Sequence, residues 1–445
     1  MGEGRLSPLR RRLHALSFVD EFGPVYAVYT LWFNDNGLSA GDVSTVFLVW
    51  AVVALALEIP SGALADRVDR RRLLAVAFAI RAGGISLWLL WPTLPGVIIG
   101  AVGWAVHDAL ASGSWEAMIH DQLSAVGAAD RYGPVMARIG QFSHLGVATG
   151  TLVGAGLLRL DVELVVLGWL TVAAHAGSIG LVVTMPAVDA TPEPVEVGEA
   201  PGSVDQTDSA GSVAPMGSTG DVDGRTAPAD ADRALGRPTV EPGELIESTW
   251  WSTLRTGVGQ AASEPVVLRL VVLGALLEGL WLVDEYLPLV ARAQGGSDAA
   301  APVLILVVWL GLLAGGEIAA RRPRLGGRSA GLALIGGAAL MSGALASGRV
   351  LALALVAVGY AALEATRVVA DARLQERARG DVRATVASVR GFGASAISMV
   401  ALATIGAMAA GDDPTPGLYL LLVAIGLAGL GVIRWLPRPA TTKAR

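Results

Sequence analysis

The chain has 445 residues, of which 53% are hydrophobic and 16% are charged, and its formal net charge at pH 7 is −6. Soluble domains carry about 25% charged residues. Apolar stretches long enough to cross a bilayer recur here from end to end, which excludes an ordinary globular fold and indicates a polytopic membrane protein. The chain has no cysteine, which excludes disulfides, thiolate metal sites and cysteine nucleophiles.

The N-terminus begins like a signal peptide, with basic residues ahead of an apolar segment over residues 5–33. The apolar part contains Asp20 and Glu21, however, and has no small-residue cleavage pattern. We therefore expect a retained first membrane helix.

A membrane helix needs roughly 20 residues to cross the hydrocarbon core, and on this ruler the sequence predicts twelve helices. The first six are expected at residues 14–35, 41–65, 72–92, 95–120, 133–158 and 162–186. The second six are expected at residues 265–291, 300–320, 329–347, 350–374, 387–410 and 416–437. The expected fold is thus an all-α polytopic membrane protein with two pseudo-symmetric six-helix bundles, residues 1–186 and 263–445.

A long polar break separates the two sets of helices. Residues 187–248 hold thirteen Asp and Glu against three Arg and almost no large apolar residue. Such a segment buries too little apolar surface to offset the entropy of ordering, so we interpret it as a disordered acidic linker. Residues 249–262 that follow are expected to form an interfacial amphipathic helix, with Trp250 and Trp251 at the headgroup level.

The arginines give the orientation. They gather at both termini and in the loops that lie on the same side as the termini, whereas the loops on the other side are poor in arginine. By the positive-inside rule both termini and the central linker are expected to be cytoplasmic, and the protein to lie in the plasma membrane of a bacterium.

The two halves resemble each other weakly. Asp20 lies seventeen residues before Gly37, and Glu278 lies seventeen residues before Gly295. A pair of arginines seven residues apart also starts the fifth span of each half. Internal symmetry of this kind is typical of transporters built from repeats, which bind their substrate where the repeats meet.

The sharpest motif is GALADRVDRRRLL, residues 62–74, between the second and third spans. It resembles the signature loop of the major facilitator superfamily, G-x-L-A-D-R-x-G-R-R/K-x-x-L, with Asp69 in place of the usual second glycine. The resemblance extends over the whole membrane body and implies a secondary active transporter that works by alternating access. A worn copy in the second half, residues 316–328, has Ala320 at the position that corresponds to Asp66.

In that family the loop latches the two halves together in the outward-open state, and the resemblance implies the same role here. A glycine allows the end of the second span to approach another helix closely, an aspartate suits a neighbouring helix N-terminus, and the arginines can pair with cytoplasmic acids. We favour this role over one of fixing topology only, and the expected latch consists of Gly62, Asp66, Arg67, Arg70, Arg71 and Asp121.

Charged residues inside the spans need a partner or a function, since each costs at least ~2.5–3.5 kcal/mol at the bilayer centre. A proton carrier must gain and lose a proton as it faces alternate sides of the membrane. Asp284 and Glu285 are the first candidates for this role, and further candidates are Asp108, Asp20 and Glu278. Because adjacent helix residues point about 100° apart, we expect one residue of each adjacent pair to face the cavity. Arg81 is expected to form a structural ion pair with an acid of the first half.

The resemblance implies that spans 1, 4, 7 and 10 line a central cavity. The remaining cavity candidates on these spans are Glu21, Tyr26, Tyr29, His107, Glu116, Trp281, Tyr286, Glu364 and Arg367, with Trp104 and Trp115 as further aromatic candidates. For His107, simple packing is the alternative. Acids outnumber arginines among these residues, which favours a cationic or neutral substrate over an anionic one.

We interpret the chain as a proton-coupled exporter of a drug or metabolite. Residues 112–123 are similar to segments of bacterial efflux-type members, although no Gly-Pro pair stands in residues 140–156 and the fourth span lacks the arginine that many members use. The alternatives are proton-linked or facilitated uptake, and a non-transporting scaffold or sensor that uses the acidic linker.

We expect no enzyme, because no G-x-x-x-x-G-K-[ST] nucleotide-binding loop is present. No catalytic residue, metal or cofactor is expected, and the proton gradient supplies the energy. The expected partners are the lipid bilayer and a small molecule, with no nucleic acid, and the protein is expected to be a monomer.

Overall fold

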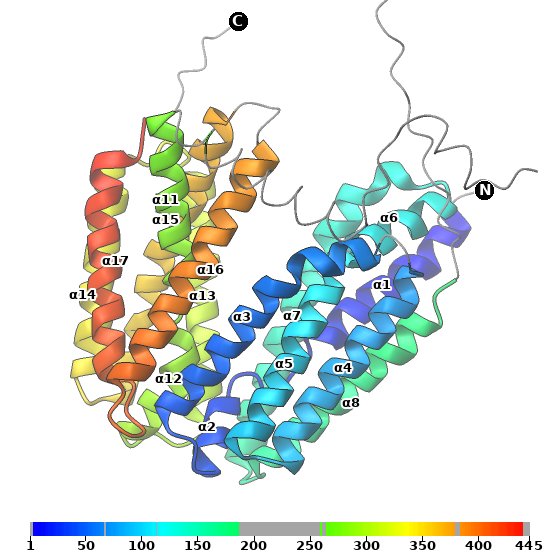
Figure 1. Cartoon of the computed structure of the whole chain (residues 1–445), viewed down its shortest axis with the longest axis horizontal. Coiled ribbons are helices and arrows are strands. Elements are labelled where there is room, and N and C mark those ends of the chain that lie inside the picture. The colour runs from blue at the N-terminus through cyan, green and yellow to red at the C-terminus, as the bar shows by residue number, and fades with distance from the viewer. Residues whose placement is uncertain are drawn as a thin grey trace, which may run out of the picture. The chain divides into compact units, whose positions relative to one another are not determined.

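The computed structural model describes residues 3–65, 68–112, 114–186, 259, 264–378 and 383–438. The helices of the first half are α1 (Glu3–Glu21), α2 (Tyr29–Asp35), α3 (Ala40–Ala65), α4 (Arg70–Leu90), α5 (Leu94–Ala111), α6 (Ser114–Ala125), the 3-10 helix η1 (Ala129–Arg131), α7 (Tyr132–Arg159) and α8 (Leu164–Val183). Those of the second half are α11 (Pro265–Gly279), α12 (Val283–Ala293), α13 (Ala300–Arg321), α14 (Gly327–Ala346), the 3-10 helix η2 (Val350–Leu355), α15 (Val356–Arg377), α16 (Arg383–Met408) and α17 (Thr415–Trp435) (Figure 1). The described helices of both halves belong to one compact unit.

The expected all-α polytopic membrane fold is confirmed. Among the described residues, 10 segments are long and apolar enough to cross a membrane. The other two expected spans differ for separate reasons. The first is divided between α1 and α2, and the fifth forms as the 28-residue helix α7, whose polar side chains lower its mean hydropathy.

The packing of the helices is pseudo-symmetric. In the first half α1 packs on α7 and α8, α4 packs on α5 and α8, and α3 packs on α5. The second half repeats this pattern: α11 packs on α16 and α17, α14 packs on α15 and α17, and α13 packs on α15. The halves meet through two equivalent seams, α3 with α16 and α7 with α13, and through α2 with α12. The internal repeat seen in the sequence therefore extends to the whole arrangement.

The expected first span, residues 14–35, is broken between Glu21 and Tyr29. Pro24 cannot donate a backbone hydrogen bond, and Gly23 precedes it, so a continuous helix is unfavourable here. In a membrane the freed backbone groups need other partners. The backbone N–H of Val25 donates to Thr171 Oγ1 of α8 at 3.3 Å, and the break is thus held by a side chain of a neighbouring helix.

A row of glycines on α7 lets the broken segment after α1 approach the α7 backbone closely. Gly146, Gly150 and Gly154 stand at four-residue spacing and permit tight helix contact. A Cβ atom at Gly150 would lie 2.9 Å from the backbone nitrogen of Gly23, and one at Gly154 would lie 2.9 Å from the carbonyl oxygen of Pro24. The backbone of the break consequently packs directly on the backbone of α7.

The seventh span is broken at the equivalent place. The expected helix over residues 265–291 is divided into α11 and α12, which are separated by residues 280–282. The carbonyl oxygen of Gly279 at the end of α11 accepts a hydrogen bond from Ser398 Oγ at 3.0 Å. In both halves a short helix follows the break and ends two residues before a glycine with positive φ, Gly37 (86°) and Gly295 (80°). The two breaks place α2 and α12 against each other.

Two other expected spans also depart from a single α-helix. The span over residues 95–120 is divided into α5 and α6, and Ser112 has an extended backbone, in keeping with the weak helix propensity of the Ser- and Gly-rich sequence there. The span over residues 350–374 starts as the 3-10 helix η2 before α15. The remaining spans form close to their expected bounds.

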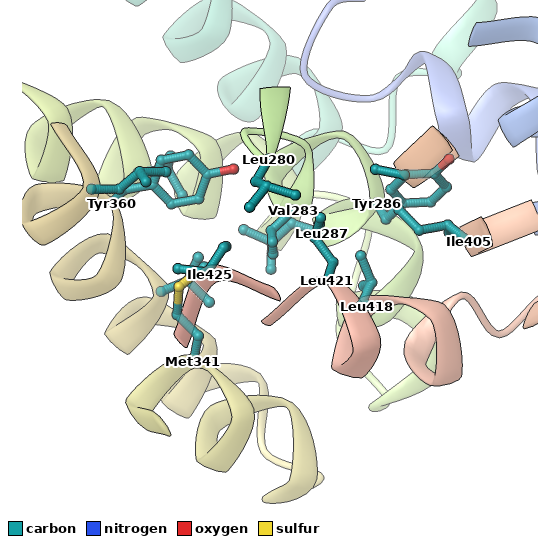
Figure 2. Close-up of a cluster of buried hydrophobic side chains, with 14 of the residues drawn as sticks. Leu280, Val283, Tyr286, Leu287, Met341, Tyr360, Ile405, Leu418, Leu421 and Ile425 are labelled. Carbon is teal, nitrogen blue, oxygen red and sulfur yellow. The ribbon is translucent and has the colours of Figure 1, made fainter. Parts of the chain in front are cut away.

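An apolar cluster fixes α12 within the second half (Figure 2). Val283 and Leu287 of α12 are 1% and 0% exposed and pack against side chains of α14, α15, α16 and α17. Figure 2 shows two tyrosines at opposite sides of this cluster, Tyr360 on one and Tyr286 on the other. One face of α12 is thus bound to the core, and its remaining residues are free to serve the site.

The expected linker, residues 187–248, lies outside the described residues. The same holds for the expected interfacial helix over residues 249–262, of which only Gly259 is described. Both stay predictions.

The close approach of α4 and α5 gives a test of the packing. A Cβ atom at Gly84 would lie 2.6 Å from the carbonyl oxygen of Gly100. A Cβ atom at Gly83, by contrast, would have no neighbouring heavy atom of the described residues within 4 Å. We expect Gly84→Val to destabilise the protein by about 1–3 kcal/mol, the usual cost of overpacking, and Gly83→Val to have little effect. Thermal unfolding of the two purified variants measures the difference, and equal losses would contradict the described packing.

Candidate transport site

A central cavity of about 310 Å³ lies where the two halves meet. Its lining comes from α1, α2, α3, α4, α5, α7, α12 and α13 and from the break that follows α1. Six of the residues predicted for proton coupling or for the cavity line it: Glu21, Tyr26, Tyr29, Trp104, Asp284 and Glu285. Its other lining residues include Thr30, Phe33, Phe47, Trp50, Arg81, Trp88, Thr151 and Trp309. Its volume is at the lower end of the range for small-molecule sites.

Three of the lining residues are acids that form no ion pair within the described residues: Glu21, Asp284 and Glu285. Both acids at the start of α12 face the cavity, whereas of the first pair only Glu21 does. The expectation of one acid for each pair is therefore wrong for Asp284 and Glu285. The reason is the break, because both residues stand in the first turn of α12, where no preceding helical turn covers them.

Tyrosines hold the two acids of α12. The Tyr360 hydroxyl donates to Asp284 Oδ1 at 2.6 Å and accepts the backbone N–H of Asp284 at 2.9 Å. This N–H is one of the donors that the first turn of a helix leaves unpaired. The Tyr29 hydroxyl donates to the Glu285 carboxylate. Since Tyr29 belongs to α2 and Glu285 to α12, this hydrogen bond joins the two halves.

Aromatic rings form much of the cavity wall. Tyr29 stacks on Trp88 with ring centroids 5.8 Å apart, and Trp88 lies 5.4 Å from Trp104. The ring of Phe47 meets Tyr29 edge-on at 5.9 Å. Aromatic faces carry negative potential, so a wall of this kind suits apolar or cationic groups.

A buried charge network lies behind this wall. The Arg81 guanidinium is 3.8 Å from Asp20 Oδ1, and it lies over the rings of Trp104 at 4.8 Å and Tyr26 at 5.2 Å. The expected ion pair of Arg81 with an acid of the first half is thus present. Asp20 is also 3.6 Å from Nδ1 of His175, whose Nε2 is 2.6 Å from the Tyr26 hydroxyl. Asp20 does not line the cavity.

Asp108 and Glu278 line a second cavity, of about 330 Å³, between α3, α5, α11 and α16. Asp108 accepts a hydrogen bond from Trp50 Nε1 at 3.1 Å, and its other oxygen is 3.1 Å from His107 Nδ1. Glu278 forms an ion pair with Arg390. Trp50 lines both cavities, so only this side chain is common to the two.

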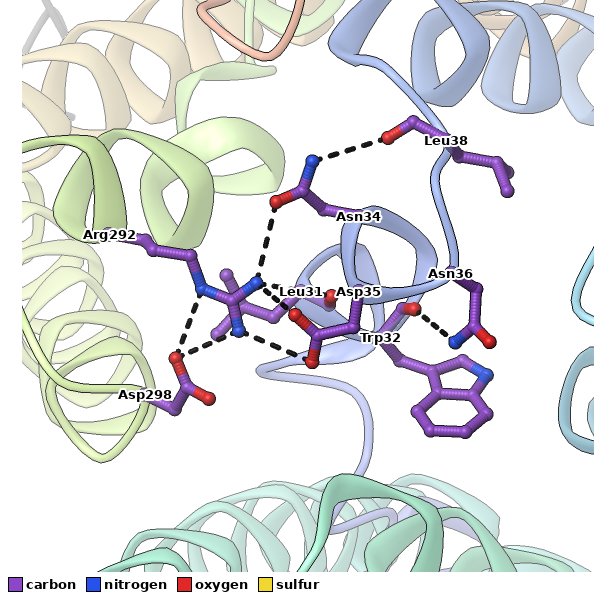
Figure 3. A network of polar contacts seen from close by, with 8 residues as sticks. All are labelled: Leu31, Trp32, Asn34, Asp35, Asn36, Leu38, Arg292 and Asp298. Atoms are coloured by element: carbon purple, nitrogen blue, oxygen red, sulfur yellow. Dashed lines mark hydrogen bonds and ion pairs between the residues drawn. The ribbon is translucent and has the colours of Figure 1, made fainter.

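At one end of the molecule Arg292 of α12 joins the halves (Figure 3). Its guanidinium donates to Asp35 Oδ1 at 2.5 Å in the first half and to Asp298 Oδ1 at 2.8 Å in the second. The carbonyl oxygen of Leu31 and Asn34 Oδ1 lie 3.5 and 3.4 Å away. Nearby, the backbone N–H of Ala40 donates to the carbonyl oxygen of Gly411 at 3.1 Å. We call this end, with Asp35, Asp298 and Gly411, the gate end.

The expected latch is described in part. Arg70 forms the anticipated ion pair with Asp121 of α6, and Arg71 donates to the carbonyl oxygen of Met185 at 2.7 Å. Asp69 caps α4 by accepting the backbone N–H groups of Arg71 and Arg72, which gives the replacement of the usual glycine a structural role. Asp66 and Arg67 lie outside the described residues, and Gly62 falls within α3. All the described contacts stay within the first half, and the latching role stays a prediction.

Several predicted cavity residues lie elsewhere. Glu116 is exposed on α6. Glu364 and Arg367 pair with each other on α15 at 2.8 Å, and Trp281 packs against Arg367 and Tyr360. Tyr286 is fully buried and bonds Ser44 of α3 at 2.7 Å. His107 packs on Phe78, and Trp115 of α6 is partly buried against an apolar cluster of the first half. None of these lines the central cavity, because depth along a helix does not say which way a side chain points.

The sequence of the chain matches the Major Facilitator Superfamily over residues 13–403. The chain belongs to this superfamily. The MFS-type transporter YxaM of Bacillus subtilis is 26% identical over 144 residues, 32% of this chain and 34% of that protein. An MFS-type transporter of Mycobacterium tuberculosis strain H37Rv is 32% identical over 145 residues, 33% of this chain and 32% of that protein. Each match thus spans about a third of the relative's length.

Solved structures of this superfamily share the fold. A bacterial homologue of ferroportin in an inward-facing state gives a TM-score of 0.67 at 12% identity and covers 97% of this chain and 100% of that one. The nucleoside transporter NupG gives 0.65 at 12% identity and covers 97% and 100%. A D-xylose–proton symporter gives 0.62 at 16% identity and covers 98% and 99%. The chain shares the fold of these membrane transporters.

Sequence reasoning missed several residues that complete the lining of the central cavity, and it missed Arg292. Trp50, Trp88, Thr30 and Trp309 stand in spans where any apolar or small residue would satisfy the pattern, so no signal marked them. Arg292 had a signal, since it is an arginine at the arginine-poor end of its span.

The buried ion pair gives a prediction about stability. The Asp20→Asn substitution leaves the Arg81 cation without a counter-charge. The Arg81→Met substitution leaves the Asp20 carboxylate without a counter-charge. Removing one partner of a buried pair costs about 3–5 kcal/mol, so we expect each variant to lose about 3 kcal/mol of unfolding free energy in detergent micelles. The double variant should lose at least ~1 kcal/mol less than the sum. Arg159→Met at the exposed end of α7 is the control. Additive losses would show that the pair is not coupled.

The Arg292 cluster gives a prediction about the gate end. Because the chain has no cysteine, Leu160→Cys and Leu351→Cys can carry a unique pair of spin labels. The two leucines are 75% and 90% exposed and belong to opposite halves. We expect Arg292→Gln to broaden the measured distance distribution toward longer distances, because the ion pairs across the halves are lost.

The matched control for this variant is Arg321→Gln. Arg321 Nε lies 2.5 Å from Glu317 Oε1 in an exposed ion pair on a single helix. The Arg321→Gln substitution should therefore leave the distance distribution unchanged. An Arg292→Gln distribution identical to that of the wild type would show that the cluster does not hold the gate end closed.

Proposed function

We propose that this transporter exports small organic cations in exchange for protons, with Glu285 as the main proton carrier. The observation that carries the proposal is the lining of the central cavity. Three acids, Glu21, Asp284 and Glu285, stand there without an ion-pair partner among the described residues, inside a wall of aromatic rings.

The charge of the cavity favours a cation. Arg81 is the one base among the lining residues, and Asp20 behind the wall compensates it. The three acids therefore leave a surplus of negative charge in a site lined largely by apolar and aromatic side chains, where an anionic substrate is repelled and a cation is attracted. The rings of Tyr29, Trp88 and Trp104 add a favourable surface for a cationic group.

Exchange follows from competition for the same charge. A carboxylate that balances a cationic substrate is neutralised when it binds a proton, and the substrate then loses its counter-charge. Proton binding and cation binding thus oppose each other at one group, and opposed binding at alternating sides is what an antiporter requires.

Glu285 suits the carrier role because its hydrogen bond crosses the two halves. Tyr29 donates to its carboxylate from α2, and the bond has to break if the halves separate at this end. Asp284, by contrast, bonds Tyr360 of its own half. A change in the protonation of Glu285 therefore acts on the contact that alternating access must open, and Asp284 and Glu21 contribute charge to the cavity.

The arginine distribution supports a plasma-membrane location with the gate end outside and both termini in the cytoplasm. The described latch residues Arg70 and Arg71 bond within their own half, while Arg292 joins the halves at the gate end. These contacts support a state that is closed toward the outside. Proton-linked uptake uses the same cavity, and the assay below separates it from export.

Transport in cells tests the proposal. We would measure the accumulation of fluorescent organic cations and neutral drugs in efflux-deficient bacteria that express the wild type, Glu285→Gln or the control Glu317→Gln. We expect the wild type to lower the accumulation of a cation several-fold, and a protonophore to abolish this effect. Glu285→Gln should lose at least about 90% of the activity, because a neutral amide cannot exchange a proton.

Glu317→Gln should transport like the wild type, since Glu317 is exposed on α13 and pairs with Arg321. A Glu285→Gln variant with wild-type activity would remove Glu285 as the carrier. A rise in accumulation would establish uptake instead of export. No change for any compound would overturn export of foreign cations.

A further inference from the structure

A third cavity, of about 220 Å³, lies in the seam between α7 and α13. His144, Val147 and Ala148 line it from the first half, and Leu306, Trp309 and Leu310 line it from the second. We call it the side cavity. It lies near the middle of both helices, at the depth of the hydrocarbon core.

The side cavity and the central cavity share a wall. Val147 and Trp309 line both of them. The side chains of Val147 and Trp309 therefore lie between the two spaces.

The outer face of the side cavity is turned toward lipid. Leu310 and Leu313 line it and are 63% and 60% exposed, on a helix that is long and apolar enough to span the membrane. Exposed leucines at this depth contact acyl chains and not water. A molecule dissolved in the bilayer thus meets the side cavity first.

One polar group stands in this apolar opening. His144 Nδ1 is 2.5 Å from the carbonyl oxygen of Gly140, which can only accept, so Nδ1 carries the proton. In the neutral ring Nε2 is then an acceptor, and it has no hydrogen-bond partner among the described residues. The ring of His144 meets Trp309 edge-on at 6.1 Å. An N–H donor and a cationic aromatic group both find a partner here.

The equivalent seam on the other side is built differently near the gate end. There α3 and α16 meet through small residues, and a Cβ atom at Gly406 would lie 2.8 Å from Ser44 Cβ. This seam also holds the second cavity, but Asp108, Glu278 and two serines of α16 line that cavity, whereas the side cavity is apolar apart from His144 and Trp309 Nε1.

We propose that the side cavity is a lateral port through which lipophilic organic cations with N–H donors enter the central cavity directly from the bilayer. The inference rests on the proposed function, and it narrows the substrate to molecules that partition into the membrane. In this proposal His144 Nε2 accepts a hydrogen bond from the N–H group of the substrate. The Trp309 side chain, which lines both cavities, moves to let the substrate pass from one to the other.

Photolabelling tests the port independently of transport. The full-length protein is reconstituted into bilayers that contain a hydrophobic aryl diazirine, irradiated and analysed by mass spectrometry of peptides. We expect label on Val147 and Trp309 as well as on the exposed Leu310. Ala148→Trp, and Leu306→Trp from the opposite helix, should fill the side cavity and remove label from Val147 and Trp309 at least tenfold.

Transport of rhodamine 6G, a lipophilic cation with ethylamino N–H groups, is measured in the same proteoliposomes. We expect at least a tenfold slower flux in both plug variants and competition between rhodamine 6G and the label. The matched control is Leu152→Trp, on α7 and 59% exposed but outside both cavities, which should change neither readout. Unfolding temperatures identify a plug variant that is merely misfolded.

The outcomes separate the port from the proposed function. Label on Leu310 but not on Val147 and Trp309 would show that no opening exists. Label that rhodamine 6G does not displace, with unchanged flux in both plug variants, would show a cavity filled only by lipid. Either result overturns the port while Glu285→Gln still tests the proton carrier. Wild-type flux that depends on the port but not on Glu285 would overturn the carrier and keep the port.

Discussion

Every ionisable side chain within this membrane body has to be reconciled with the cost of leaving water. Most are neutralised in place: Arg81 lies beside Asp20, Arg390 forms an ion pair with Glu278, and Arg367 pairs with Glu364 on the same helix. Glu21, Asp284 and Glu285 are not neutralised in this way and stand instead around the central cavity. The same constraint thus sorts the charges into structural pairs and a small set that is available for a ligand or a proton.

Backbone hydrogen bonding imposes a second constraint, and the two helix breaks meet it with side chains. Thr171 accepts the N–H of Val25, Ser398 donates to the carbonyl of Gly279, and Tyr360 accepts the N–H of Asp284. The breaks turn α2 and α12 toward each other, which is why Tyr29 reaches Glu285 and Arg292 reaches Asp35. The contacts of α2 with α12 that join the halves are therefore consequences of broken helices.

Pseudo-symmetry arranges the helices, but the residues in equivalent places have different roles. Asp20 and Glu278 occupy matching positions, yet Asp20 lies buried beside Arg81 and His175 whereas Glu278 borders a cavity and pairs with Arg390. The two seams between the halves also differ, with small residues near the gate end of one and the His144–Trp309 pair in the other. A repeated fold thus supplies a symmetric frame of helices, and the side chains make the two halves of that frame different.

The sequence by itself determined that this is a membrane protein, and it determined the two sets of spans and the signature loop. The reason is that local hydropathy and charge decide which segments of a chain enter the bilayer. The sequence also marked Glu21, Asp284 and Glu285, since a carboxylate inside an apolar run is unusual wherever it points. Only the tertiary structure decided that Asp20 turns to Arg81, that Tyr286 bonds Ser44 and that Glu116 is exposed. These outcomes depend on which face of a helix meets which neighbour, and the breaks after Glu21 and Gly279 changed those faces by interrupting the helical period on which a sequence argument relies.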